Sequence, residues 1–103
     1  MFSEQMQERL GRLGRNLQLA RKRRRKTLRQ AATMIGTSVS SVRRMEAGDP
    51  SVKFGTYLAA LEVYQLDESL RFAEPEDDRI GLTLDKQRLP VRIRLKKEKR
   101  LDF

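Results

Sequence analysis

Apolar side chains recur at spacings of three and four through much of the chain, which is the pattern of helices that bury one face. The first such face consists of Met6, Leu10, Leu13, Leu17 and Ala20. Gly11 and Gly14 interrupt its first half, and glycine is unfavourable inside a helix because it loses the most conformational freedom there. The pattern therefore predicts a firm helix from about Asn16 to Arg24, preceded by a stretch that is frayed, bent or ordered only by a partner.

The next segment begins with a capping signal and ends with a glycine. Thr27 stands three residues before Gln30, a spacing at which each side chain can satisfy a backbone donor of the other. Gly36 suits the left-handed conformation that ends many helices. A short helix of about two turns is predicted between these signals. Its inward face consists of Leu28, Ala31, Ala32 and Ile35.

Serine residues mark the predicted starts of the third and fourth helices. Ser38 is a good N-cap for the third helix, and Gly48 closes it. Val42 and Met45 are expected to face inward from this helix. Ser51 is predicted to cap the fourth helix in the same way. The core face of the fourth helix consists of Phe54, Tyr57, Leu58 and Leu61.

A last helix is predicted to begin at Asp67 and to contain Leu70 and Phe72. Together these segments predict an all-α domain of five helices over residues 14–73. Residues 1–13 are predicted to be an N-terminal extension of this domain.

After the domain, the composition changes to charged residues with little helical periodicity, so residues 74–103 are predicted to form an arm. Apolar and basic residues alternate over positions 91–96, which is the period of a half-buried β-strand. A lone strand is unstable, and the nearest partner is the same strand of a second copy across a two-fold axis. The arm is therefore predicted to contain one short β-strand and to form a dimer through Val91, Ile93 and Leu95.

Composition narrows the range of functions. The chain has 23 Lys and Arg against 14 Asp and Glu, and its formal net charge of +9 is typical of proteins that bind phosphate backbones or anionic surfaces. It has neither cysteine nor histidine, which removes disulfides, thiol nucleophiles, histidine bases and the usual zinc sites. We therefore expect no enzyme activity, no cofactor and no metal site. No apolar run is long enough to span a bilayer or to form a signal-peptide core, so we expect a cytoplasmic protein.

The positive charge is densest at residues 21–26, where six cations follow one another. Taken alone, such a run is typical of a solvated tract or an address signal. Its position at the C-terminal end of the first predicted helix is favoured by the helix dipole and can place it near a DNA backbone. We therefore expect the run to contribute to DNA binding.

Two short helices around a glycine turn outline a helix-turn-helix, and the residues within it are specific. The run from Thr27 to Gly48 resembles the signature of the Xre/Cro family of repressors. The matching positions are Ala32, Gly36, Ser38, Val42, Glu46 and Gly48. The resemblance covers residues 14–73 and implies a lambda-repressor-like fold. It also implies that the helix starting at Ser38 lies in the major groove of DNA.

Carried over by position, the resemblance implies two sets of DNA contacts. The residues expected to face base edges are Val39, Ser40 and Arg44. The residues expected to face phosphates are Thr27, Ser38, Arg43 and Lys53. Many family members carry glutamine where this chain has Leu28, so either Leu28 turns into the core or Arg29 takes over on the DNA backbone. Glu46 is expected to be structural and to pair with an arginine or cap backbone groups.

The stretch from Asp49 to Leu61, followed by a charged tail with a β-type segment, is similar to HipB-type antitoxins of type II toxin–antitoxin systems. The resemblance implies a homodimer that binds an inverted-repeat operator, represses its own operon and binds a HipA-like serine/threonine kinase toxin. The alternative is a stand-alone Xre-type repressor of phage or metabolic genes with no toxin partner. A pure dimerisation or scaffold module and a basic binder of RNA are further interpretations. No membrane partner is expected, because the first helix lacks a large exposed apolar face.

Overall fold

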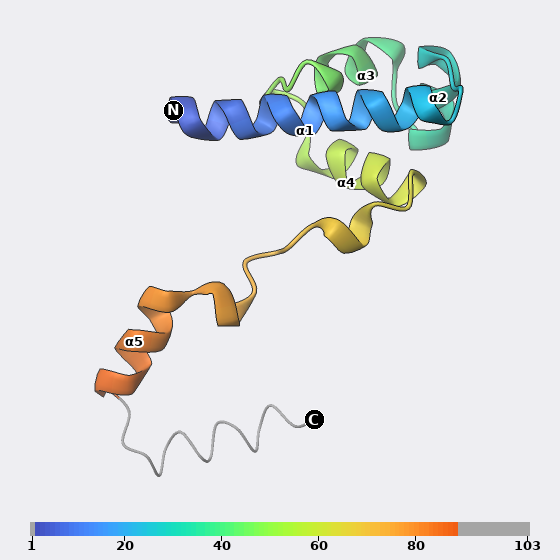
Figure 1. The fold of residues 1–103 in the computed structure, drawn as a ribbon. Helices are drawn as coiled ribbons and strands as arrows, with labels where there is room; N and C mark the ends of the chain where they lie inside the picture. The colour runs from blue at the N-terminus through green and yellow to red at the C-terminus, as the bar shows by residue number, and fades with distance from the viewer. Residues whose placement is uncertain (1, 89–103) are drawn as a thin grey trace. The chain divides into compact units, whose positions relative to one another are not determined.

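The computed structural model describes residues 2–88, and every element within that range is helical. The chain forms two units, one up to Leu70 and one from Arg71 onward, and each is described by itself. The first unit (Figure 1) contains α1 (Glu4–Arg23), α2 (Leu28–Ile35), α3 (Val39–Glu46), α4 (Phe54–Val63) and the 3₁₀ turn η1 (Asp67–Ser69). The second contains the 3₁₀ turn η2 (Pro75–Asp77) and α5 (Arg79–Arg88). The all-α prediction is confirmed for these residues, whereas the predicted strand with Val91, Ile93 and Leu95 lies outside them.

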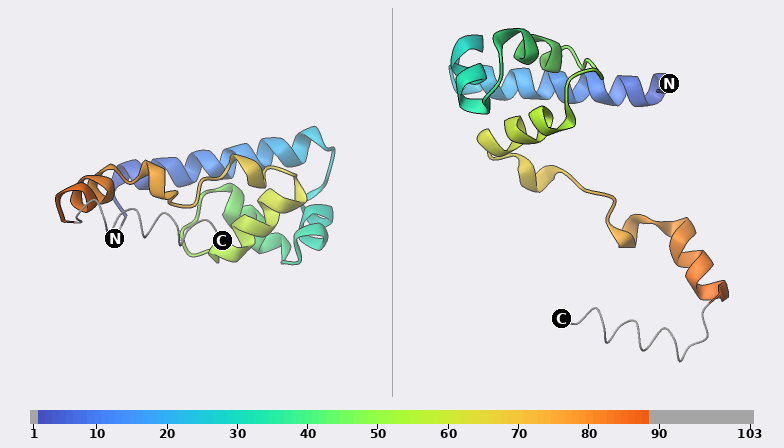
Figure 2. Two further views of the ribbon diagram at one scale, coloured as in Figure 1. Left: turned by 90° about the horizontal axis from the view of Figure 1, so that it is seen from below. Right: turned by 180° about the vertical axis from the view of Figure 1, so that it is seen from behind.

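The first helix is longer than the sequence predicted. α1 runs without a break from Glu4 to Arg23, and the Ser3 hydroxyl caps its start by accepting a backbone hydrogen bond. α1 lies alongside α3 (Figures 1 and 2). Near its start, the Gln7 side chain donates a hydrogen bond of 3.0 Å to the carbonyl of Gly48. The prediction that the stretch before Asn16 is frayed, bent or ordered only by a partner is wrong, because tertiary contacts within the chain hold the N-terminal half of α1.

The glycines of α1 allow it to approach the end of α3 closely. A Cβ atom on Gly14 would lie 2.6 Å from the carbonyl oxygens of Met45 and Glu46. Gly48 has a φ of +73°, and a Cβ atom there would lie 2.5 Å from the Cα atom of Gly11. Real Cβ atoms do not come this close to backbone, so a larger residue at either position would push the two segments apart.

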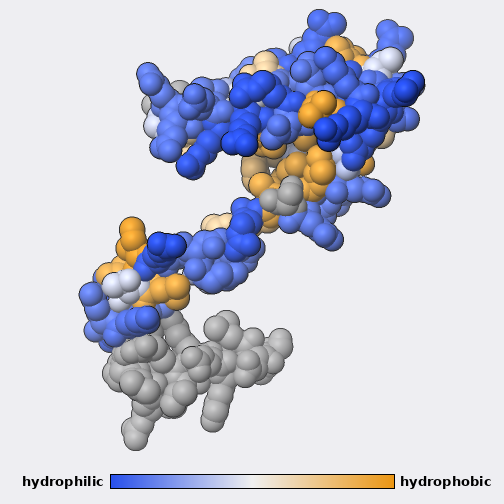
Figure 3. Space-filling model, in the orientation of Figure 1, coloured by the Kyte–Doolittle hydropathy of each residue, from blue (hydrophilic) through white to orange (hydrophobic). Residues whose placement is uncertain are grey.

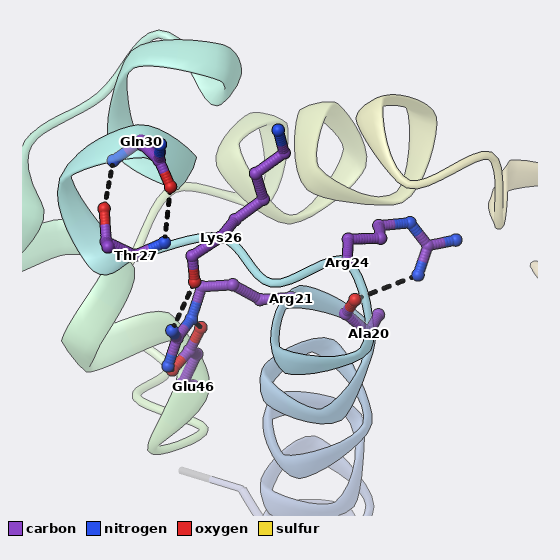
Figure 4. Close-up of polar contacts among 7 residues, drawn as sticks. All are labelled: Ala20, Arg21, Arg24, Lys26, Thr27, Gln30 and Glu46. Atoms are coloured by element: carbon purple, nitrogen blue, oxygen red, sulfur yellow. Dashed lines mark hydrogen bonds and ion pairs between the residues drawn. The ribbon is translucent and has the colours of Figure 1, made fainter.

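The local signals around α2 and α3 act as predicted. Thr27 Oγ1 accepts from the Gln30 amide at 3.1 Å, and Gln30 Oε1 accepts from the Thr27 amide at 2.9 Å (Figure 4). Gly36 ends α2 in the left-handed conformation with a φ of 84°. At the start of α3, the Ser38 hydroxyl accepts from the Ser41 amide at 3.0 Å. These bonds satisfy backbone donors that the first turn of a helix leaves open.

The start of α4 differs from the prediction. Ser51 does not cap it, because its amide and its hydroxyl both donate to Asp49 Oδ1, at 2.8 and 2.7 Å. This local turn ends before the helix, and α4 begins at Phe54 after Lys53, which makes no side-chain capping bond. Phe54 is 65% exposed, so its predicted place in the core is wrong, whereas Tyr57 is buried as predicted.

The chain after α4 also departs from the prediction. The helix expected from Asp67 is limited to the single turn η1, and Phe72 is exposed beyond it. Residues 79–88, for which the sequence pattern predicts no helix, form α5. The carboxylate of Asp78 accepts from the Gly81 amide at 2.9 Å at the start of this helix. Such a local cap favours a helix even where apolar periodicity is weak.

The core of the first unit lies among α1, α2, α3 and α4. Its largest fully buried side chains are Leu17, Val42, Met45 and Tyr64. Burial of a Val, Leu or Met side chain contributes about 1.5–3 kcal/mol relative to exposure. The Tyr57 hydroxyl donates to the carbonyl of Asp49 at 2.9 Å and fastens α4 to the turn that follows α3. The core therefore holds α3 from its inner face and from its C-terminal end.

Candidate nucleic-acid interface

The inner face of α3 is packed, and its other faces are open to solvent. Val42 and Met45 are fully buried, and α3 packs against both α1 and α2. Ser40, Arg43 and Arg44 are exposed. A helix divided in this way can enter a DNA major groove while its packing stays intact.

The three residues predicted to face base edges differ in exposure. Ser40 and Arg44 are exposed, whereas Val39 is partly buried and packs against the core. Arg44 Nη2 donates to Ser41 Oγ at 3.4 Å, a long bond that leaves most of the guanidinium donors open. Ser40 and Arg44 are therefore available to base edges, and Val39 offers only part of its side chain.

The four residues predicted to face phosphates are all exposed. They are Thr27, Ser38, Arg43 and Lys53. The Thr27 hydroxyl accepts a capping bond and keeps its own proton for another acceptor. The Ser38 hydroxyl accepts a capping bond and also donates to Ser41 Oγ at 3.0 Å. Thr27 is therefore better placed than Ser38 to donate to a phosphate oxygen.

A polar depression of about 370 Å³ beside α3 brings Arg44 and Lys53 together. The other residues that line it are Gly36, Thr37, Ser41, Ser51, Val52 and Thr56. Such a depression suits duplex DNA, because an arginine can reach a base edge while a lysine and hydroxyl groups donate to neighbouring phosphate oxygens. The four hydroxyl residues were not predicted from the sequence. A signal was present for Thr37 and Ser51, which directly follow the turn residues Gly36 and Pro50.

Arg43 lies in a different place from Arg44. It lines a second hollow of about 330 Å³ together with Gln18, Arg21, Leu28, Glu46 and Ala47. Leu28 packs against the core, whereas Arg29 is exposed. Of the two alternatives at this position, the structure therefore shows Leu28 turned towards the core. A contact of Arg29 with the DNA backbone stays a prediction.

The first cation of the basic run at residues 21–26 is part of the core. Arg21 is buried and forms a two-bond ion pair with Glu46, with Nε–Oε2 at 2.7 Å and Nη2–Oε1 at 3.1 Å (Figure 4). Arg21 Nη1 also donates to the carbonyl of Lys26 at 2.9 Å. The hydrogen bonds that Arg21 donates to the Glu46 carboxylate raise the pKa of Arg21 against the opposing effect of burial. The structural role predicted for Glu46 is confirmed, and the prediction that the run serves DNA is wrong for Arg21.

Arg24 of the same run is also bound to the protein itself. Its guanidinium donates to the carbonyl of Ala20 at 2.9 Å and to that of Tyr64 at 2.7 Å. It also lies over the Tyr64 ring, 5.3 Å from the ring centre, in a cation–π contact. The exposed cations of the run that remain open to an anionic partner are therefore Lys22, Arg23 and Arg25.

The turn before α4 carries a carboxylate whose charge is stabilised locally. The Ser51 backbone amide, followed by the Ser51 hydroxyl, holds the pKa of Asp49 below its ordinary value. Asp49 does not line the polar depression. Its role in the described structure is to shape the turn that presents Ser51 and Lys53.

A family model described as a helix-turn-helix domain matches residues 12–73, well over half of the chain. The chain belongs to the helix-turn-helix domain family. Comparison with curated proteins and with solved structures finds no match. In this helix-turn-helix domain, α2 and α3 are the two helices on either side of the turn at Gly36.

Family membership makes the protein a DNA-binding regulator in its general class. The polar depression and the exposed face of α3 both belong to the matched residues. Among the helices of residues 2–88, none combines the length and the apolar character needed to cross a membrane.

Proposed function

We propose that this helix-turn-helix protein is a sequence-specific repressor that binds double-stranded DNA as a homodimer. The observation that carries the proposal is the open face of α3, where Arg44 shares a polar depression with Lys53 and Ser40 is exposed nearby in sequence. Arg44 can bind guanine through O6 and N7, and Ser40 can bond to several bases. The Lys53 ammonium can pair with a DNA phosphate. Such a contact fixes the position of the protein on the duplex but does not distinguish one base from another.

The charge of the chain supports the same proposal. A formal net charge of +9 attracts a polyanion, and each phosphate contact releases bound counterions from DNA. The affinity for DNA is therefore expected to fall steeply with salt. In a dimer, two copies of α3 about 34 Å apart would read an inverted repeat with half-sites one helical turn apart. The proposed dimer arm is the segment with Val91, Ile93 and Leu95.

We further propose that the protein represses its own operon and that another gene of this operon encodes a HipA-like serine/threonine kinase toxin. The support is the resemblance of residues 49–61 and of the charged tail to HipB-type antitoxins. A kinase-like reading frame beside the gene, whose product co-purifies with this protein, would favour the antitoxin. A phage lysogeny or metabolic operon would favour a stand-alone Xre-type repressor.

The test of DNA reading compares the duplex upstream of the protein's own gene with a shuffled duplex of equal length, at about 0.15 M salt. Arg44→Ala is expected to remove about 1–3 kcal/mol of discrimination at one base pair per half-site. Lys53→Ala is expected to weaken both duplexes alike and to lower the salt slope by about one per protomer. The charge-matched control is Arg12→Ala, since the exposed Arg12 lines neither hollow beside α3.

Equal losses on the two duplexes for both Arg44→Ala and Lys53→Ala would contradict the assigned roles. Equal binding of both duplexes by the unmodified protein would contradict operator recognition at this site. Losses as large for Arg12→Ala would show that only the net charge matters.

A further inference from the structure

An apolar pocket of about 390 Å³ lies between the N-terminal half of α1 and the start of α4. Met6, Leu10 and Leu13 line it from α1, and Phe54 and Tyr57 line it from α4. In the space-filling view, apolar side chains gather over α4 below α1 (Figure 3). None of these side chains belongs to the proposed set of DNA contacts. Apolar pockets of about 300–1,000 Å³ are typical sites for small ligands.

Three apolar side chains around this pocket are left open to solvent. Phe2, Met6 and Phe54 are 55%, 48% and 65% exposed. Single exposed apolar residues are ordinary on a protein surface, but three that share one hollow indicate a binding surface. A methionine can also adapt its shape to an irregular ligand. The pocket therefore favours an occupant with an apolar body.

One cation lines the same pocket. Arg9 is exposed, and its guanidinium has no hydrogen-bond or ion-pair partner among residues 2–88. The other lining side chains are uncharged, and the Tyr57 hydroxyl already donates to the carbonyl of Asp49. A guanidinium can bind a carboxylate through two parallel hydrogen bonds. The lining therefore matches a molecule with an apolar body and one anionic end.

The volume of the pocket limits the size of this molecule. Benzene occupies an apolar cavity of about 150 Å³, so a pocket of about 390 Å³ has room for an acid of roughly eight to ten carbon atoms. We propose that the pocket binds a small apolar carboxylic acid of this size. Its carboxylate pairs with Arg9, and its hydrocarbon part packs against Met6 and Phe54.

The segment between α3 and α4 connects this pocket with the polar depression beside α3. Pro50, Val52 and Phe54 line the apolar pocket, whereas Ser51 and Lys53 line the polar depression. Val52 lines both. An acid that contacts Val52 and Phe54 therefore acts on the stretch of backbone that carries Lys53.

Occupancy of the pocket is expected to strengthen DNA binding. The bound acid favours the described arrangement of the segment and so restrains Lys53 beside the polar depression. A side chain that is already held loses less freedom when it binds a phosphate. By linkage, DNA then raises the affinity for the acid by the same factor. This effect on DNA rests on the proposed function, whereas binding of the acid does not.

The first experiment is calorimetric titration of the full chain with octanoate, and with 1-octanol as its uncharged counterpart. Arg9→Gln is expected to weaken octanoate binding about tenfold and to leave octanol binding unchanged, because only the acid loses a partner. Arg12→Gln is the charge-matched control, since the exposed Arg12 does not line the pocket. It is expected to leave both affinities unchanged.

A second variant tests the apolar wall. Phe54→Ala is expected to weaken octanoate and octanol alike, several-fold, because both lose the same hydrophobic contact. Phe72→Ala is its control, since Phe72 is 55% exposed and lies outside the pocket. It is expected to change neither affinity.

Methyl NMR locates the bound acid. The signals of Met6 and Val52 are expected to shift on titration with octanoate, whereas that of Met34 is expected to stay. Met34 is 43% exposed but lies outside the pocket. Shifts at Met34 with none at Met6 would overturn the assignment of the site.

Several results would overturn the proposal. Octanoate that shows no saturable binding up to about 1 mM would do so. Equal losses in Arg9→Gln and Arg12→Gln would also do so, because net charge alone would then attract the acid. If octanoate does not bind and Phe54→Ala lowers the sedimentation coefficient, the pocket is an interface between copies of the chain and the proposal is wrong.

The effect on DNA is tested separately. Saturating octanoate is expected to raise the affinity of the unmodified protein for the duplex upstream of its gene several-fold, and to leave that of Arg9→Gln unchanged. Saturable binding of octanoate without a change in DNA affinity would overturn the coupling. If octanoate binds as expected but no duplex is selected, the proposed function is wrong and the acid site stands. If a duplex is selected and octanoate does not bind, the reverse holds.

Discussion

The same substitution at two positions of α1, Gly11→Ala and Gly14→Ala, is expected to change stability in opposite directions. Alanine has less freedom than glycine in the unfolded chain, and at a compatible helix position it stabilises by about 0.4–1 kcal/mol. At Gly11 a Cβ atom would meet only Arg15 Nη1, at the ordinary contact distance of 3.4 Å. Gly11→Ala is therefore expected to keep this gain in full.

At Gly14 the steric cost exceeds the gain. A Cβ atom there would lie 2.6 Å from the carbonyl oxygens of Met45 and Glu46 and 2.8 Å from the Gly48 nitrogen. All three are backbone atoms, so the contact is relieved only if α1 and the end of α3 move apart. Overpacking costs about 1–3 kcal/mol, and three backbone contacts place this site at the upper end. With about 1 kcal/mol of helix gain subtracted, the net loss is expected to be about 2 kcal/mol.

Thermal and urea unfolding of the full chain, followed by circular dichroism, measures both changes. In a domain of 60–100 residues, 1 kcal/mol shifts Tm by about 4–8 °C. Gly11→Ala is expected to raise Tm by several degrees, and Gly14→Ala to lower it by about twice as much. Gly14→Ala is also expected to weaken DNA binding, because α3 must shift, whereas Gly11→Ala leaves it unchanged. If both variants raised Tm equally, the close approach of α1 to α3 would be refuted.

The buried ion pair and the buried tyrosines allow two further predictions. Glu46→Ala leaves Arg21 buried without its carboxylate and is expected to cost about 3–5 kcal/mol in urea unfolding. The double variant Arg21→Met with Glu46→Met is expected to recover most of this loss, and a single loss below about 1 kcal/mol would contradict a buried pair. Burial raises the pKa of Tyr57 and of Tyr64 in the folded protein. Their contribution to the free energy of unfolding is therefore complete below the ordinary tyrosine pKa of about 10. It is lost as the pH rises from there through the higher pKa values of the folded state. Melting temperatures measured from about pH 8 to pH 11 are expected to fall above pH 10, less so in Tyr57→Phe, and the same decline in that variant would contradict a contribution from Tyr57.

The helix signals that depend on near neighbours could be predicted from the sequence. The capping box of Thr27 and Gln30 and the cap at Ser38 lie where their spacing places them. Gly36 takes the left-handed conformation expected of it. Each of these outcomes depends on hydrogen bonds between residues within about four positions, which act before any tertiary contact forms.

Where two local signals compete, their spacing alone did not decide the outcome. Ser51 was predicted to cap α4, but Asp49 stands two residues before it and takes both of its donors. A local cap was also missed at α5, where the Asp78 carboxylate accepts from the Gly81 amide. The apolar residues of this segment are too few to predict a helix. A cap and a turn use the same donor groups, and the surrounding packing selects between them.

The candidate site was predicted in part. The exposure of Ser40 and Arg44 follows from the spacing of Val42 and Met45, because residues between the buried positions of a helix point elsewhere. The placement of Arg44 and Lys53 around one depression cannot be predicted from the spacing of residues in the sequence. It depends on the turn between α3 and α4, which the contact between Tyr57 and Asp49 holds in place.

The sequence by itself determined the helical class, the helix-turn-helix with its caps, and the inner face of α3, since these depend on short-range spacing. Only the tertiary structure decided that Gly14 is a contact between α1 and α3 and not a weak point of the helix. It also decided that Arg21 of the basic run is buried against Glu46, 25 positions away, whereas the predicted core residue Phe54 is exposed. These outcomes depend on which distant segments come into contact. That contact decides whether an arginine is part of the core or available to DNA.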